Sequence, residues 1–149
     1  GAGGAVKGVL ANLIAESPST IYIANRTVAN AQALVDAVQS EVKIHAVHYD
    51  DIPTEAFDFI INGTSAGLQG ELPKVHPSAV STHTWCYDMI YGAGDTKFQA
   101  WSKSLLAAHA FDGLGMLVEQ AAESFRIWRG YSPQTAPVIR QLRHLLAQS

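Results

Sequence analysis

The chain is poor in cysteine and in charge. It has a single cysteine among 149 residues, Cys86, so no internal disulfide can form, and only 15% of its residues are charged. The formal net charge is -3 and no run of Lys or Arg is long enough to follow a phosphate backbone. We therefore expect no nucleic-acid partner, and a buried thiol at Cys86 that suits a reducing compartment.

Long hydrophobic runs are also missing. No apolar stretch approaches the roughly 20 residues of a membrane span, and the first residues lack the charged start and long apolar core of a secretory signal. We expect a cytoplasmic protein with no membrane partner. The six histidines form neither a helical HxxxH pair nor a cluster with the cysteine, so no metal site is predicted.

Apolar residues, by contrast, make up 48% of the chain. They are enough for one sizeable core, and we predict one domain over residues 1–149. Short β-branched segments alternate with segments whose apolar residues recur at helical spacing. The expected strands cover 20–24, 42–49, 57–62, 84–89 and 107–111, and the expected helices cover 6–15, 28–40, 96–106, 113–129 and 136–147. This alternation predicts an α/β fold with a Rossmann-like, doubly wound parallel sheet.

The chain opens with the letters GAGGA, directly before the first expected helix. Glycine permits a positive φ in a tight turn, and its missing Cβ lets backbone N–H groups approach a pyrophosphate at the positive end of a helix. We therefore interpret Gly1, Ala2, Gly3, Gly4 and Ala5 as a phosphate-binding turn, seen without the strand that should precede it. An ordinary glycine-rich turn fits the same letters.

Polar residues follow the strand expected at 20–24. Asn25, Arg26 and Thr27 stand near the place where an acidic residue would accept hydrogen bonds from the ribose 2′-OH of NAD. A carboxylate there would repel a 2′-phosphate, whereas an Arg binds it through paired, charge-assisted hydrogen bonds. The segment favours NADP over NAD, although a solvated Arg before a helix is an alternative interpretation.

Two later motifs also follow strands. The strand expected at 57–62 ends in small hydroxyl residues, whose backbone can pass close under a dinucleotide. The longest helix begins at Gly113 and Gly115, although a helical glycine costs about 1 kcal/mol relative to Ala. We attribute these two glycines to close approach of a ligand. Gln120, further along that helix, is placed to offer a neutral amide to a polyhydroxylated substrate.

In their order along the chain, these segments resemble the C-terminal cofactor domain of the shikimate dehydrogenase family. The resemblance is carried by GAGGA, NRT, NGTSAG, CYDMIYG and DGLGMLVEQAA, of which the last two are the most specific. It implies a Rossmann-like domain that binds NADP. It also implies a reversible hydride transfer between NADPH and 3-dehydroshikimate, which gives shikimate.

The resemblance implies roles for single residues as well. The turn at 1–5 would hold the pyrophosphate, and Asn25, Arg26 and Thr27 would hold the adenosine 2′-phosphate. The residues assigned to the nicotinamide half are Thr64, Ser65, Met89 and Gly113. Tyr91 and Gln120 would contact shikimate.

The family's proton-handling Lys and Asp lie in an N-terminal substrate domain that this chain lacks. We therefore assign no catalytic residue within the 149 positions. A chain that begins at Gly1 is also expected to lack the central strand of the sheet, and hence to be poorly soluble and inactive alone. Two alternative functions are a quinate/shikimate dehydrogenase paralogue and a non-catalytic nucleotide-binding module.

Overall fold

A computed structural model of the chain describes residues 1–66 and 71–148. Helices and strands alternate along most of these residues. In chain order they are α1 (Gly4–Ala15), β1 (Thr20–Ala24), α2 (Val28–Asp36), β2 (Lys43–Val47), η1 (Tyr49–Asp51), β3 (Phe59–Asn62), η3 (Pro77–Ala79), β4 (Trp85–Asp88), α3 (Lys97–Ser104), β5 (His109–Phe111), α4 (Leu114–Arg129) and α5 (Thr135–Leu146). The described strands all pair in parallel, which confirms the predicted α/β class.

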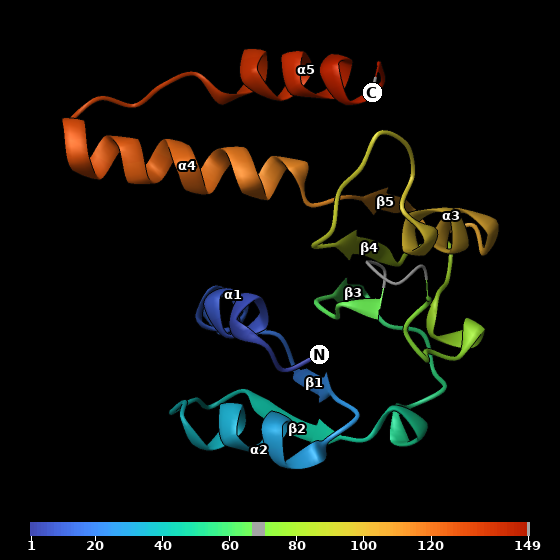
Figure 1. Cartoon of the computed structure of the whole chain (residues 1–149). Helices are drawn as coiled ribbons and strands as arrows, with labels where there is room; N and C mark the ends of the chain where they lie inside the picture. The colour runs from blue at the N-terminus through green and yellow to red at the C-terminus, as the bar shows by residue number, and fades with distance from the viewer. Residues whose placement is uncertain (67–70, 149) are drawn as a thin grey trace.

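The described strands form two separate sheets. β1 pairs with β2 in one, and β4 lies between β3 and β5 in the other. β1 and β3 are not hydrogen-bonded to each other, so the order across the fold is β2-β1, a break, and then β3-β4-β5 (Figure 1). The break leaves one edge of β1 and one edge of β3 without a strand partner among the described residues.

Helices cover opposite faces of these strands, as in a doubly wound fold. α1 and α2 pack over β1 and β2 around the buried residues Leu10, Ile23 and Ala31. On the other sheet, Phe98 of α3 packs against Cys86 of β4 and Val80. Figure 1 shows α1 and α3 on opposite sides of the strands. The buried thiol expected at Cys86 is confirmed, and burial raises its pKa.

Several elements end elsewhere than the sequence predicts. β3 begins at Phe59 because the N–H of Phe57 donates instead to the Ala79 carbonyl of η3, over 3.0 Å. β2 ends at Val47 rather than at residue 49, and η1 follows it. There Nδ1 of His48 accepts a hydrogen bond from the Asp50 N–H at 3.3 Å. α2 ends at Asp36 rather than at residue 40. For β2 and β3, local polar contacts rather than the apolar pattern set the boundary.

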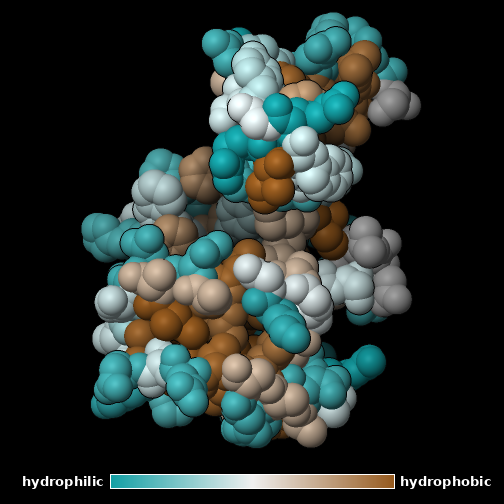
Figure 2. All heavy atoms as spheres, turned by 90° about the vertical axis from the view of Figure 1, so that its left-hand side faces the viewer, coloured by the Kyte–Doolittle hydropathy of each residue, from teal (hydrophilic) through white to brown (hydrophobic). Residues whose placement is uncertain are grey.

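A groove of about 560 Å³ lies between β1 and β3. Its lining is mostly apolar and includes Leu13 of α1, Ile21 of β1 and Ile61 of β3. Figure 2 shows brown, apolar side chains gathered at the level of α1 and β1. The Gly1 nitrogen donates to the Ala24 carbonyl at the end of β1, over 2.7 Å. Two open strand edges with Gly1 at their carboxyl end fit one further parallel strand that ends at Gly1.

We expect a protein extended upstream of Gly1 by an apolar strand to unfold at a higher temperature than one that begins at Gly1. The strand would pair with β1 and β3, and each backbone hydrogen bond contributes about 1 kcal/mol net. Differential scanning calorimetry on both proteins measures the difference. An extension of equal length rich in Gly and Ser is the control, and equal melting temperatures for all three would contradict this use of the groove.

α4 and α5 form a helical hairpin that projects from the β5 edge (Figure 1). Its anchor is Arg143 of α5, whose Nη1 and Nη2 donate to the two carboxylate oxygens of Asp112, each over 2.6 Å. Asp112, which directly follows β5, is 7% exposed. Hydrogen bonding to Asp112 raises the pKa of the Arg143 guanidinium.

Arg143→Ala should lower the stability of the protein by about 1 to 2 kcal/mol. Removing the Arg143 side chain leaves the buried Asp112 carboxylate without its cation. The loss of stability stays near the low end of the usual range because the guanidinium is 43% exposed. Arg126→Ala is the matched control, since Arg126 makes a similar two-point contact with Glu123, whose side chain is 55% exposed against 5% for that of Asp112. Urea unfolding measures both. Equal losses would mean that the Asp112 pair contributes no more than a surface pair.

Candidate functional site

The strands run in parallel within each sheet, and Gly1 lies against both Ala24 at the end of β1 and Gly63 after β3, so the carboxyl ends of the two sheets meet at one edge of the fold. Ligands of open α/β sheets bind at this edge. The segments that follow the strands here include residues 25–27 after β1, 63–66 after β3, 89–92 after β4 and 112–113 after β5. The glycine turn reaches the same edge through the contact of Gly1 with Ala24. The structure thus brings together most of the segments that the sequence singles out.

The glycine turn lies at the N-terminus of α1, which starts at Gly4, two residues earlier than expected. The first turn of α1 carries no acidic side chain, and a Cβ on Gly3 or Gly4 would meet nothing within 4 Å. The positive end of this helix is therefore open around Gly3 and Gly4, which are both exposed. An anion such as a pyrophosphate fits there.

The reason given above for glycine in this turn is partly wrong. Among the described glycines, Gly130 alone has a positive φ, so the turn does not need a left-handed backbone. Close approach is what requires glycine at position 1, because a Cβ there would lie 2.7 Å from the carbonyl oxygen of Gly63. The first turn and the end of β3 touch through their backbones.

Close backbone packing also accounts for Gly113. We expected a ligand to require this glycine, and the structure gives a second reason: a Cβ on residue 113 would collide with the carbonyl of Met89. The Gly113 N–H donates to the Ile90 carbonyl over 2.9 Å, which holds the start of α4 against the loop after β4. A Cβ on Gly115 would meet nothing within 4 Å, so its role stays a prediction.

Asn25, Arg26 and Thr27 continue directly from β1. The Asn25 N–H donates to the Val47 carbonyl over 3.1 Å, and its side-chain amide donates to the Thr27 carbonyl over 2.8 Å. These bonds fix the turn, while Arg26 is exposed. Thr27 precedes α2 as its N-cap residue without a side-chain capping bond. The segment presents a cation and a helix N-terminus beside the glycine turn.

The segment after β3 is held by Asn62, which is 3% exposed. Its Oδ1 accepts hydrogen bonds from the N–H of Thr64 at 3.1 Å and from the Thr64 hydroxyl at 2.8 Å. The same hydroxyl accepts the Ala66 N–H over 3.3 Å, and Ser65 is exposed. The last glycine of the NGTSAG motif, Gly67, lies outside the described residues.

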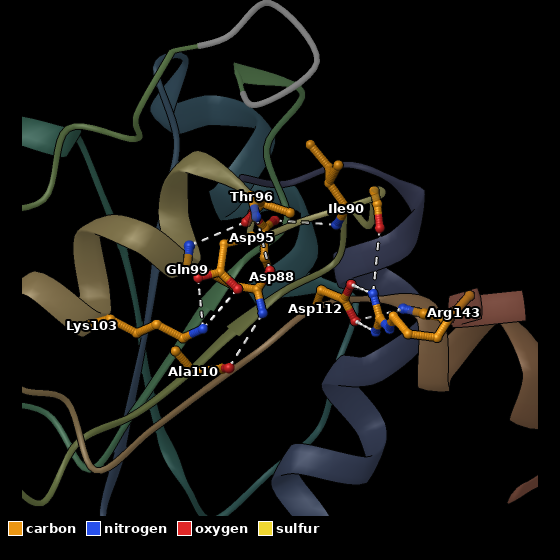
Figure 3. A network of polar contacts seen from close by, with 11 residues as sticks. Asp88, Ile90, Asp95, Thr96, Gln99, Lys103, Ala110, Asp112 and Arg143 are labelled. Atoms are coloured by element: carbon orange, nitrogen blue, oxygen red, sulfur yellow. Dashed lines mark hydrogen bonds and ion pairs between the residues drawn. The ribbon is translucent and has the colours of Figure 1, made fainter. Parts of the chain in front are cut away.

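Asp88 ends β4 and is fully buried. Its carboxylate accepts a hydrogen bond from the Asn62 amide at 3.1 Å. It also accepts from the Ile90 N–H at 3.2 Å and from the Thr96 hydroxyl at 2.6 Å (Figure 3). No role was expected for Asn62 or Asp88 from the sequence. A polar residue at the last position of an otherwise apolar strand was the available signal.

The two residues expected to contact a substrate lie on separate elements. Tyr91 is on the loop after β4 and is 41% exposed. Gln120 is on α4, is exposed, and donates a hydrogen bond from Nε2 to the Leu117 carbonyl of its own helix over 3.0 Å. Both side chains are therefore accessible, as a ligand contact requires.

Across residues 1–66 and 71–148, no three His, Cys, Asp or Glu side chains gather as metal ligands would. None of the helices in these ranges has the length and apolar character needed to cross a bilayer.

Two family models match this chain. One, described as shikimate / quinate 5-dehydrogenase, matches residues 1–72, and the other, the shikimate 5′-dehydrogenase C-terminal domain, matches residues 113–143. A curated relative from Alkalilimnicola ehrlichii, named shikimate dehydrogenase (NADP(+)), is 54% identical over 143 residues. That match covers 96% of this chain and 53% of the relative.

Solved structures share the fold. An Ael1 enzyme from Pseudomonas putida has a TM-score of 0.84 and 40% identity, over 95% of this chain and 52% of its own. A shikimate dehydrogenase in complex with NADP+ has a TM-score of 0.82 and 29% identity, over 98% and 53%. The chain spans about half the length of the curated relatives it matches. As its motifs predict, it belongs to the shikimate/quinate dehydrogenase family.

Proposed function

We propose that the protein is an NADP-dependent shikimate dehydrogenase, which reversibly reduces 3-dehydroshikimate to shikimate, and that residues 1–149 are its NADP-binding domain. One observation carries the proposal. The exposed Arg26 follows β1 directly, and the glycine turn contacts the end of the same strand through Gly1 and Ala24. A cation beside an open helix N-terminus suits a dinucleotide with an extra phosphate.

Each segment at the carboxyl edge would then bind one part of NADP or the substrate. Gly1–Ala5 bind the pyrophosphate, and Asn25, Arg26 and Thr27 bind the 2′-phosphate. The residues proposed to line the nicotinamide half are Thr64, Ser65, Met89 and Gly113. Tyr91 and Gln120 contact shikimate. NADPH supplies the hydride when bound, and this chain supplies binding and orientation.

No side chain of this chain is assigned to proton transfer. We propose that the groups that handle the substrate proton lie in an N-terminal substrate domain, since the curated relatives are about twice as long as this chain. We also propose a cytoplasmic location and a small-molecule substrate, without a nucleic-acid or membrane partner. The low charge and the lack of basic runs support this part of the proposal.

Two alternatives are tested by the same assays. A quinate/shikimate dehydrogenase paralogue is one, because the model that matches residues 1–72 carries both substrate names. Full-length protein that oxidises quinate faster than shikimate would favour it. Protein that binds NADP but oxidises neither substrate would favour a non-catalytic nucleotide-binding module.

Arg26→Ala in the full-length protein should raise the KM for NADPH by about ten- to a hundredfold and leave the KM for NADH nearly unchanged. The substitution removes a charge-assisted contact worth about 1.5 to 3 kcal/mol that only the 2′-phosphate can make. Steady-state kinetics with both cofactors measure the split. Arg129→Ala, at the far end of α4, is the control. Equal losses with NADPH and NADH would refute the 2′-phosphate assignment.

Gln120→Ala should lower kcat/KM for shikimate by about three- to tenfold, the effect of one lost neutral hydrogen bond. NADP binding should not change, because the proposed cofactor contacts lie on other segments. Shikimate titrations and calorimetric titration with NADP separate the two effects. Gln141→Ala on α5 serves as the matched control. Parallel losses of cofactor and substrate affinity would show that Gln120 has a structural role instead.

A further inference from the structure

A buried polar pair joins the carboxyl ends of β3 and β4. Asn62 and Asp88 are partners in the parallel register and are 3% and 0% exposed. The Asn62 amide donates to the Asp88 carboxylate over 3.1 Å. The strand residues before them, such as Ile60 and Cys86, are apolar and belong to or pack on a core cluster. Burying this pair is costly unless its hydrogen bonds are satisfied, so its contacts matter.

Each member of the pair fixes a different loop. Asn62 holds Thr64 by two bonds, to its N–H and to its hydroxyl. Asp88 holds the Ile90 N–H, and it also accepts from Thr96, the residue that caps α3. Figure 3 shows the Ile90 and Thr96 contacts converging on Asp88. Among the described residues no buried side-chain N or O atom lacks a partner, so this network is satisfied.

The network extends to the third loop of the edge. The Ile90 carbonyl accepts the Gly113 N–H over 2.9 Å, and the Asn62 carbonyl accepts the Met89 N–H over 3.0 Å. The segments after β3, β4 and β5 are therefore linked through one hydrogen-bonded unit. Asn25–Thr27 follow β1, which lies in the other sheet, across the break between β1 and β3.

We propose that Asn62 and Asp88 are positioning residues for the nicotinamide half of the site. The inference rests on the proposed function. Both side chains are too deeply buried to serve as the main ligand contacts, and they act by fixing Thr64 and the backbone around Met89. The pair controls hydride geometry and nicotinamide affinity, but it leaves the adenosine 2′-phosphate end unaffected.

The test uses Asn62→Asp in the full-length protein. This change puts two carboxylates side by side and removes the hydrogen-bond donor between them. The loops after β3 and β4 are then no longer held in fixed positions relative to each other. A displacement of about 1 Å at a reacting centre can cost about a hundredfold in rate, and we expect kcat for shikimate oxidation to fall at least tenfold. NADPH affinity should fall, while affinity for adenosine 2′,5′-bisphosphate stays within about twofold of the wild-type value.

Two further variants separate positioning from simple instability. The double variant Asn62→Asp/Asp88→Asn again has one amide and one carboxylate, and it should recover most of the lost kcat and NADPH affinity. Thr84→Val removes a buried hydroxyl that donates to the Phe57 carbonyl at the opposite, amino end of β4. It should lower the melting temperature without changing the ratio of NADPH to adenosine 2′,5′-bisphosphate affinity.

The outcomes are distinct. Wild-type protein without NADP-dependent shikimate oxidation would overturn the proposed function, and the binding ratio, which needs no turnover, would still test the positioning role. The positioning inference is overturned if Asn62→Asp keeps wild-type kcat and binding ratio. It is equally overturned if both ligands weaken together, or if the double variant shows no recovery.

Discussion

Close backbone packing around Met89 is the constraint on which the carboxyl edge depends. The Met89 carbonyl occupies the space that a side chain at residue 113 would need, and the Gly63 carbonyl likewise leaves no room for a side chain at residue 1. Parallel strands bring these loops to one edge, but only residues without a Cβ let them touch. The open helix N-terminus and the loops after β3, β4 and β5 hold their places because of these contacts.

Much of this arrangement could be predicted from the sequence. The β-branched segment 20–24 became β1 without a change of boundary, and the NRT letters after it mark the end of that strand. Such features are local, since a strand and the polar residues that follow it are adjacent in the chain. The family resemblance followed from motifs that are also contiguous, and the family models confirm it.

The features that could not be predicted join residues far apart in the chain. Asn62 and Asp88 meet only because β3 and β4 pair in one register, 26 positions apart. The contact between Asp112 and Arg143 spans 31 positions and depends on how α5 folds back. The sequence shows that Gly113 is unusual. It does not show that the Met89 carbonyl lies against this glycine, because Met89 is on another segment of the chain.

The anchor of the helical hairpin has a mechanical consequence. Arg143 donates to the Gly92 carbonyl over 3.4 Å as well as to Asp112, so α5 is attached both to the loop after β4 and to the residue that follows β5. A displacement of α5 away from β5 therefore has to break both contacts or move these two segments with it.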